Sequence, residues 1–229
     1  MDAWNKYNMA RLRFGLDAEL DPYQLALATQ TNDKNIHEKM CPYLVSLKSK
    51  KVDGSIHPAG TGFYIIHDQH LLVTAAHVVS AIGSTDQLVA FYSTGVQSDV
   101  KVIAKDMVAD IAVIKVDHSC SLPSVRFIDP CIGETVYILG FSSGSQLNFT
   151  KGMVTSKGMG TFTTSAYADN GFSGGPVFNL SMELVGMVLG GAGFAQGLTN
   201  QQVRCVTVDQ LDGFVKGILA MQPTCGGGP

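Results

Sequence analysis

Three side chains in this sequence are of the types needed for acyl transfer to and from a serine. Ser173 lies in NGFSGGPVF, His77 in LLVTAAHVVS and Asp110 in VADIAVIKV. The reaction requires a nucleophile, a base that touches it, an acid that orients the base, and N–H donors for the oxyanion. Glycines on both sides of Ser173 let the backbone turn tightly and direct successive N–H groups into one small space. Together these residues would supply the parts of such a site.

Each of the three residues also has an ordinary structural explanation. Glycine and serine populate turns for conformational reasons alone, so Ser173 could belong to a surface turn. His77 ends an apolar run and could be a core histidine whose hydrogen bonds are satisfied. Asp110 begins a strand-like run, where a carboxylate either starts a turn or, if buried, needs a partner to offset its desolvation. The rest of the sequence has to decide between these alternatives.

The elements that would position these side chains are short strands. From Cys41 onward the sequence consists of β-rich runs separated by glycine or polar turns, such as YLVSLKS, GTGFYIIHD and ETVYILGFS. About a dozen such runs predict an all-β protein rather than alternating β–α units. The runs divide near residues 119–133, which predicts two six-stranded β-barrels, one at 41–120 and one at 131–207. A cleft between two such units is a usual place for a ligand site.

The two ends of the chain have a different pattern from the middle. Residues 1–40 are polar and helix-tolerant, with apolar side chains near one side until Pro22, which predicts an N-terminal helical arm. In the stretch DQLDGFVKGILAMQ the apolar residues recur at helical spacing. We therefore expect a closing C-terminal helix at 208–221.

The composition indicates a globular protein and argues against two classes of partner. Charged residues make up 15% and hydrophobic residues 45%, which is typical of a chain with a sizeable interior. The net charge of −3 comes without any basic stripe, so we expect no nucleic-acid partner. No apolar run approaches the ~18 residues that cross a bilayer, so we expect no membrane span.

The cysteines and the first residues bear on location and on metal binding. Five cysteines are an odd number without CxxC spacing, which favours thiols in a reducing compartment over a disulfide framework. No cysteine or histidine pair has the spacing of zinc ligands, so we expect no metal and no cofactor. The segment MDAWNKYNMARLRFGLD lacks the apolar core of a secretory signal. We therefore expect an intracellular protein, either cytoplasmic or organellar.

Five motifs occur in a fixed order on this all-β background: GTGFYI, TAAHVV, DIAVIKV, GFSGGPVF and LVGMVLGG. In this the chain resembles the trypsin/chymotrypsin-like serine proteases, and most closely their intracellular Deg/HtrA branch. The resemblance covers roughly residues 41–220, and the order histidine, aspartate, serine is also that of the family. It implies a chymotrypsin-type fold and a serine endopeptidase that hydrolyses protein or peptide substrates through an acyl-enzyme.

The resemblance also implies a role for each candidate residue. His77 would be the general base and then the general acid, Asp110 would orient it, and Ser173 would be the nucleophile. The backbone N–H groups of Gly171 and Ser173 would form the oxyanion hole. The strand at residues 189–191 would pair with the substrate backbone as an added β-strand. The substrate-binding residues implied in this way are Tyr167, Ala168, Leu189, Gly190, Gly191 and the region around Gln201.

The sequence departs from the secreted trypsins in several places. Val78 stands where they carry a cysteine after the histidine, and Phe172 stands where they carry the aspartate that pairs with a new N-terminus. Activation by N-terminal clipping is therefore not expected. The predicted pocket has no acidic residue clearly at its base, and no histidine follows His118. We expect a small or medium apolar residue before the scissile bond rather than Lys, Arg, Gln or Glu.

Two further functions and two features of the Deg/HtrA branch stay open at this point. The chain could be a viral polyprotein-processing serine protease, or a protease-fold binding protein without catalysis. Deg/HtrA proteins usually carry a PDZ domain after the protease, whereas only the glycine-rich tail follows the predicted closing helix here. We expect a PDZ-less protease domain, either because the sequence is part of a longer protein or because the protein works without a PDZ domain. The N-terminal arm would mediate homo-oligomerisation, as arms do in that branch, or would cover a barrel edge.

Overall fold

The computed structural model describes residues 33–66, 70–118, 125–143, 146–191 and 202–221. The chain divides into two compact units, Met1–Met40 and Cys41–Pro229. In the first unit, residues 33–40 form a helix, and Lys34 Nζ lies 3.6 Å from Glu38 Oε1 one turn later. The rest of the predicted N-terminal arm lies outside the described residues, and so does any role of it in homo-oligomerisation.

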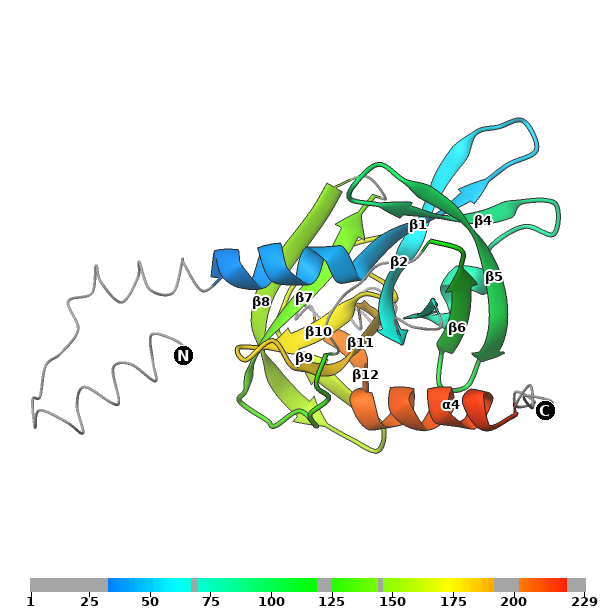
Figure 1. The fold of residues 1–229 in the computed structure, drawn as a ribbon. Helices are drawn as coiled ribbons and strands as arrows, with labels where there is room; N and C mark the ends of the chain where they lie inside the picture. The colour runs from blue at the N-terminus through cyan, green and yellow to red at the C-terminus, as the bar shows by residue number, and fades with distance from the viewer. Residues whose placement is uncertain (1–32, 67–69, 119–124, 144–145, 192–201, 222–229) are drawn as a thin grey trace, which may run out of the picture. The chain divides into compact units, whose positions relative to one another are not determined.

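The second unit begins with a 3-10 turn, η1 (Cys41–Tyr43), and continues into a closed six-stranded barrel with the order β1-β2-β3-β6-β5-β4 (Figure 1). All its neighbouring strands pair in antiparallel fashion. Its strands are β1 (Leu44–Lys50), β2 (Ile56–Ile66), β3 (Leu71–Thr74), β4 (Gln87–Tyr92), β5 (Gln97–Asp106) and β6 (Ile111–Val116).

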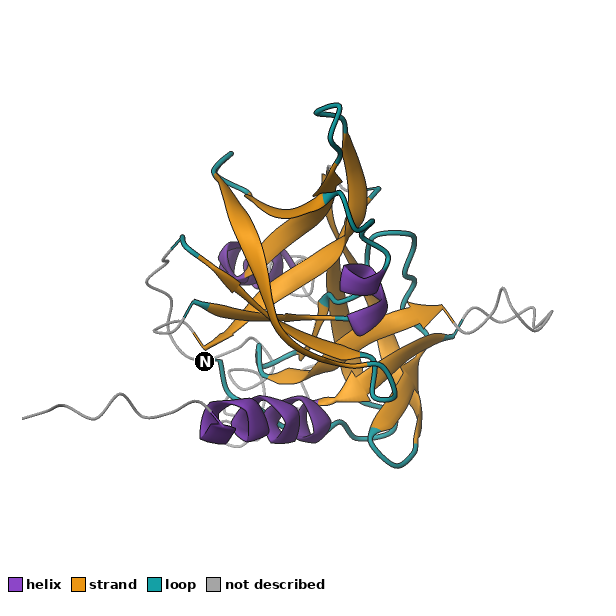
Figure 2. Cartoon of the chain, turned by 90° about the vertical axis from the view of Figure 1, so that its right-hand side faces the viewer, coloured by secondary structure: helices purple, strands orange, loops and turns teal. Residues whose placement is uncertain are grey.

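A second closed barrel follows, again with six strands, in the order β10-β11-β12-β9-β8-β7 (Figure 1). Its strands are β7 (Thr135–Ser142), β8 (Gln146–Lys157), β9 (Thr161–Thr164), β10 (Pro176–Asn179), β11 (Leu184–Gly191) and β12 (Val203–Thr207). In the described chain strands make up most of this unit, and a helix, α4, lies along one side (Figure 2). The predicted fold, two six-stranded barrels of chymotrypsin type with a closing helix, is confirmed.

Apolar side chains that alternate or run along the strands fill both barrels. β3 (LLVT) is buried at every position, and β6 (IAVIKV) is buried at all positions but Lys115. Each fully buried side chain of this size stabilises the fold by about 1.5–3 kcal/mol. The core of the second barrel includes Val136, Ile138, Val154, Phe162, Phe172, Val177, Val188 and Cys205.

The closing helix α4 (Val208–Met221) follows β12 without a break. It buries Val208, Leu211 and Val215, which lie three and four residues apart and therefore share one face of the helix. This face contacts β11, β12 and β6, so the helix touches strands of both barrels. No helix among the described residues is long and apolar enough to cross a membrane.

Candidate active site

Antiparallel strand pairing brings His77 and Asp110 to the same edge of the first barrel. β3 pairs with β6 so that Thr74, its last residue, lies opposite Ala112. His77 follows β3 in the short helix α3 (Ala76–Ser80), and Asp110 directly precedes β6. The contact continues beyond the ladder, because Ala76 N donates a hydrogen bond of 3.2 Å to the Asp110 carbonyl oxygen.

Asp110 holds His77 through both carboxylate oxygens. The His77 backbone N–H donates to Asp110 Oδ1 at 2.9 Å, and the ring Nδ1 lies 2.8 Å from Oδ2. An ionised carboxylate can only accept, so the proton of the neutral ring is on Nδ1 and the lone pair on Nε2. Asp110 has a φ of 57°, in the left-handed region that aspartate tolerates better than most residues. The ring is thus oriented with a basic nitrogen turned away from the carboxylate.

The surroundings of Asp110 favour its ionised form. Burial, the largest single influence, opposes ionisation, but the hydrogen bonds from the His77 side chain and backbone and the positive charges of His77 and Arg204 together outweigh it. They hold the pKa of Asp110 below its ordinary value of 3.8. The side chain of Asp110 is 17% exposed and that of His77 45% exposed, so the pair is open to solvent from the histidine side.

Ser173 occupies the middle of a tight turn that leads into β10. Gly175 N donates to the Phe172 carbonyl oxygen at 2.8 Å, and Gly174 has a φ of 83°. Positive φ at the third residue is the feature of a type II turn, which favours glycine there. A Cβ at Gly174 would also lie 2.2 Å from Thr74 Oγ1 and 2.3 Å from the Thr61 carbonyl oxygen. Only glycine fits, so the position of Ser173 is fixed by backbone packing.

Thr61 of β2 ties this turn to the first barrel. Its N–H donates to the Ser173 carbonyl oxygen at 2.9 Å, and its Oγ1 donates to the Gly171 carbonyl oxygen at 2.7 Å. The same hydroxyl accepts from Phe141 N at 3.0 Å, and the Thr61 carbonyl oxygen accepts from Thr74 Oγ1 at 2.7 Å. The sequence prediction did not single out Thr61. The available signal was a polar residue between two glycines, just before the apolar run FYII.

The segments that carry Ser173 and His77 meet at Gly60. A Cβ on Gly60 would lie 2.7 Å from Val78 Cγ2, next to His77, and 2.9 Å from the Ser173 carbonyl oxygen. Within the described part of the chain, however, no hydrogen bond joins Ser173 Oγ to His77 Nε2. The structure therefore brings the predicted base and nucleophile to neighbouring segments without that bond.

The two N–H groups predicted to bind the oxyanion have no acceptor among the described residues. Asn170 presents its carbonyl oxygen to Ser143 N at 3.0 Å, and in a planar trans peptide the N–H of Gly171 then points the opposite way. Gly171 has a φ of 100°, and a Cβ there would lie 2.2 Å from the Phe141 carbonyl oxygen. Neither Gly171 N nor Ser173 N donates to any of the residues that the structure describes. Between them Phe172 is buried, 2% exposed, as an anchor in the second barrel.

The predicted substrate strand lies beside the serine turn. Val188 exchanges hydrogen bonds with this turn, since Gly174 N donates to its carbonyl oxygen and its N–H donates to that of Gly175, both at 2.8 Å. Beyond Val188, a bulge at Leu189 is followed by Gly190 and Gly191, which pair with β12. Pairing with β10 ends before these residues, so within the described chain the other edge of residues 189–191 is open.

The predicted primary pocket is described only in part. Tyr167 is 48% exposed, and its carbonyl oxygen accepts from Thr150 Oγ1 at 2.5 Å. The negative charge of Asp169, with some burial and a hydrogen bond from the phenol, raises the pKa of Tyr167 above its usual value. An acidic residue therefore stands close to this pocket, which the sequence prediction did not include. Ala168 packs against the second core, and the region around Gln201 lies outside the described residues.

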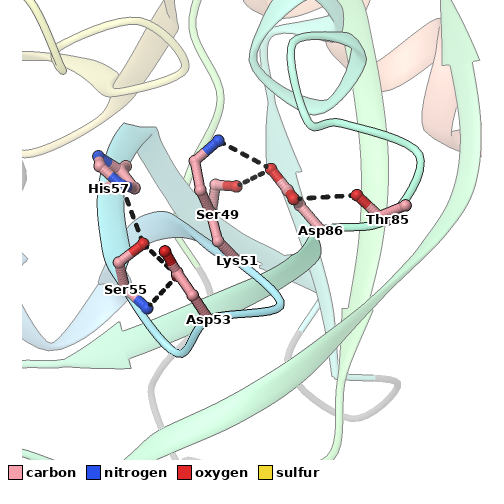
Figure 3. A network of polar contacts seen from close by, with 7 residues as sticks. All are labelled: Ser49, Lys51, Asp53, Ser55, His57, Thr85 and Asp86. Atoms are coloured by element: carbon pink, nitrogen blue, oxygen red, sulfur yellow. Dashed lines mark hydrogen bonds and ion pairs between the residues drawn. The ribbon is translucent and has the colours of Figure 1, made fainter.

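A second cluster of Asp, Ser and His side chains lies on the β1–β2 hairpin (Figure 3). Ser55 Oγ donates to Asp53 Oδ1 at 2.6 Å and lies 3.2 Å from His57 Nε2. Here the carboxylate binds the serine and not the histidine; Asp53 and His57 are exposed and Ser55 is half-buried. Ser55 N also donates to Asp53 Oδ1, and Lys51 N to the Ser55 carbonyl oxygen, which is the bonding of a hairpin turn. This cluster closes the hairpin and lacks the geometry of an activated serine.

The described residues contain no metal site and no disulfide. Among them, no group of three His, Cys, Asp or Glu side chains could hold a metal ion. Cys41, Cys131 and Cys205 are free thiols, and burial of Cys205 raises its pKa well above the usual value. A thiol of this kind is unreactive, so Cys205 serves as a small apolar core residue.

Known proteins resemble this chain in sequence and in fold. Residues 60–187 match the family model of the trypsin-like peptidase domain. A Rhizobium meliloti protein named probable periplasmic serine endoprotease DegP-like is 32% identical over 180 residues, which cover 72% of this chain and 35% of that protein. Serine protease HTRA1A of Danio rerio is 31% identical over 178 residues, 69% of this chain and 36% of that protein. The chain thus spans about a third of the length of these relatives.

A solved structure of a serine endoprotease from Yersinia pestis has the same fold. Its TM-score is 0.69, and the match covers 82% of this chain and 66% of that one at 21% sequence identity. At this identity the match supports the two-barrel architecture alone.

The prediction of an intracellular location is wrong. Relatives from Rhizobium meliloti, Rickettsia conorii and Pseudomonas putida are all named periplasmic proteins. The prediction relied on the first residues and on the unpaired cysteines. Unpaired cysteines do not fix the compartment, because two barrels with large apolar cores need no disulfide to be stable wherever they fold.

The resemblance seen in the motifs is confirmed by the comparisons. Because the family model covers residues 60–187 and the similar proteins are DegP-like and HTRA1 proteases, the chain belongs to the trypsin-like serine protease family, of the Deg/HtrA type.

Proposed function

We propose that the chain is a serine endopeptidase that hydrolyses peptide bonds through Ser173, His77 and Asp110. The observation that carries the proposal is the double hydrogen bond from His77 to Asp110, at 2.9 and 2.8 Å, beside a turn that fixes Ser173. A carboxylate that holds both the backbone and the ring of one histidine orients a base. The hairpin cluster, in which Asp53 binds Ser55, shows no such arrangement.

In the proposed reaction His77 moves one proton in each direction. Nε2 takes the proton of Ser173 Oγ as this oxygen attacks the substrate carbonyl carbon, and the imidazolium is stabilised by Asp110. The carbonyl oxygen becomes an oxyanion that the N–H groups of Gly171 and Ser173 stabilise, each worth about 3 kcal/mol. The proton then passes to the leaving amine, and an acyl-enzyme remains. Water repeats the sequence and releases the acid.

The missing hydrogen bond between Ser173 and His77 is compatible with this reaction. Catalytic hydrogen bonds are often long or misaligned without substrate, and they tighten in the complex. Rotation of the serine about χ1 moves Oγ between staggered positions while the turn keeps its backbone in place. The same observation also favours a second candidate, a protein of this fold that binds peptides without cleaving them.

The open edge of residues 189–191 supports binding of an extended peptide. A segment that pairs antiparallel to β11 would run toward the serine turn, because β11 runs away from it after Val188. The substrate residues opposite 189–191 would then precede the scissile bond. For the residue directly before that bond we propose a small or medium apolar side chain. The names of the bacterial relatives support a location in the periplasm.

Labelling with a fluorophosphonate tests the nucleophile. We expect the wild-type protein to be labelled and Ser173→Ala to remain unlabelled at an unchanged thermal midpoint. Ser55→Ala is the matched control, because Ser55 also lies beside an aspartate and a histidine, and it should label like the wild type. If Ser55→Ala is not labelled, the nucleophile is Ser55 in the hairpin and not Ser173. A folded wild type that is never labelled would favour the second candidate.

A further inference from the structure

Arg204 is an exposed cation on β12, beside the open end of β11. Its neighbours in the strand, Val203 and Cys205, are buried at 1% and 0%, so the alternation of the strand directs Arg204 to the outer face. Arg204 pairs with Gly190 of β11 on one side and with Thr163 of β9 on the other. Its side chain therefore lies on the same face as the α-carbon substituents of Gly190.

None of the residues that the structure describes fills the space over Gly190. A Cβ on this glycine would meet none of their atoms within 4 Å. A larger residue at this position would stand between Arg204 and any peptide that pairs with the open edge of β11. With glycine there, the guanidinium can extend across the strand toward such a peptide.

Arg204 has no ion-pair partner among the residues that the structure describes. Its charge nevertheless acts on Asp110, where it contributes to the lowered pKa of that carboxyl group. An unpaired, exposed guanidinium that lies within electrostatic range of the proposed site is available to bind an incoming carboxylate.

We infer that Arg204 selects peptides with an acidic side chain at the position opposite Gly190. The inference rests on the proposed function, since it assumes that substrate pairs with residues 189–191. Such a strand lies about 4.8 Å from β11, and β12 lies the same distance on the other side. A carboxylate on the peptide and the long arginine side chain meet over the glycine between them. Alternate peptide residues share this face, so the residue two positions away is the only other one that Arg204 could favour.

Peptide cleavage tests this selectivity. Fluorogenic peptides with valine before the scissile bond carry Asp, Asn or Lys at each of the four preceding positions. We expect kcat/KM to be about fivefold higher for the Asp peptide than for the Asn peptide, because a partly exposed ion pair contributes about 1 kcal/mol. This difference should occur at one position, or at two positions separated by one residue. The ratio of kcat/KM for the Asp peptide to that for the Asn peptide should fall toward one in 0.5 M salt.

Three variants assign the preference to Arg204. Arg204→Ala should bring the Asp-to-Asn ratio to about one, and Arg204→Glu should favour Lys instead. Lys101→Ala is the charge-matched control, since Lys101 pairs with Lys115 at the end of β6 away from Asp110, and it should keep the ratio. Ratios within one variant cancel any general effect on the His77–Asp110 pair, which would lower cleavage of all peptides equally. A wild-type ratio of one, or an unchanged ratio in Arg204→Ala, overturns the inference.

Binding separates this inference from the proposed function. Fluorescein-labelled versions of the same peptides are titrated into Ser173→Ala and followed by anisotropy. The Asp peptide should bind about fivefold more tightly than the Asn peptide, and Arg204→Ala in the same background should remove the difference. If the wild type cleaves nothing and is not labelled, cleavage fails as a function, but a charge-dependent Kd still supports Arg204. Equal binding of the two peptides, or no binding, overturns the role of Arg204.

Discussion

At the scale of single residues, the His77–Asp110 pair is the best-defined part of the proposed site. Asp110 adopts a left-handed backbone conformation, with a φ of 57°, and from there its two oxygens reach the backbone and the ring of the same histidine. The geometry fixes which nitrogen of His77 is free to take a proton. The chemical consequence can be tested by changing the acceptor into a donor.

Asp110→Asn should lower kcat by about 10³–10⁴-fold, because an amide NH₂ group facing Nδ1 reverses the tautomer that the base requires. Hydrolysis of a peptide substrate measures the loss, and the thermal midpoint reports on folding. Asp106→Asn is a suitable control. Asp106 accepts from Val108 N and Ala109 N in the turn just before Asp110, and no hydrogen bond or ion pair joins these two described residues, Asp106 and His77. Equal losses in the two variants would contradict the proposed role of Asp110.

The lowered pKa of Asp110 predicts a pH dependence of stability. Its folded-state pKa lies below the ordinary 3.8, so the folded state binds its proton less readily than the unfolded chain does. The resulting stabilisation is present in full above pH 3.8 and is lost as the pH falls through the lowered value. Urea unfolding at pH 7 and pH 3 should therefore show a smaller acid-induced loss in Asp110→Asn than in the wild type. If both proteins lose the same free energy of unfolding between pH 7 and pH 3, the carboxyl group of Asp110 does not contribute to the pH dependence of stability.

At the scale of elements, the site depends on strands that present particular backbone groups. β2 contributes Thr61, whose hydroxyl bonds to the carbonyl oxygen of Gly171 and to the N–H of Phe141. Both partners belong to the second barrel. One side chain of the first barrel thus supports the turn that carries the proposed oxyanion donors.

Thr61→Val keeps the shape of the side chain but removes the hydroxyl that binds the half-buried carbonyl of Gly171 and the buried N–H of Phe141. We expect the free energy of unfolding to fall by about 2–3 kcal/mol. Fluorophosphonate labelling should slow as well, because the carbonyl of Gly171 no longer has an anchor. Thr61→Ser retains the hydroxyl and should restore the labelling rate. If Thr61→Val labels as fast as the wild type, the oxyanion segment does not depend on this hydrogen bond.

The strands themselves could be predicted from the sequence because their signals are local. The apolar composition of runs such as LLVT and IAVIKV predicts that these strands are buried. In α4 the apolar residues recur at helical spacing. The contribution of Thr61 and the role proposed for Arg204 could not be predicted in this way. Each depends on a residue more than ten positions distant, the carbonyl of Gly171 for Thr61 and Gly190, which no other described residue covers, for Arg204.

At the scale of the whole two-barrel unit, the proposed nucleophile and base come from different barrels. His77 and Asp110 belong to the first barrel and Ser173 to the second, so catalysis would require the two barrels to keep their positions within a fraction of an ångström. The family motifs predict which residues meet, whereas the packing between the barrels decides how closely. At Gly60 a single added methyl group would perturb this packing.

Gly60→Ala should impair activity more than stability. The added methyl would lie 2.7 Å from Val78 Cγ2 and 2.9 Å from the Ser173 carbonyl oxygen, so the segments that carry the base and the nucleophile must move apart. A displacement of this kind can reduce the rate by about 100-fold. Gly62→Ala is the matched control in the same strand, because the atoms nearest to its methyl would be in the Leu47 and Val45 side chains, at 3.3 Å, and the Val73 carbonyl oxygen, at 3.5 Å. It should lose little labelling for a comparable shift in thermal midpoint. If the two variants lose activity and stability in the same proportion, contact between the barrels at Gly60 does not align Ser173 with His77.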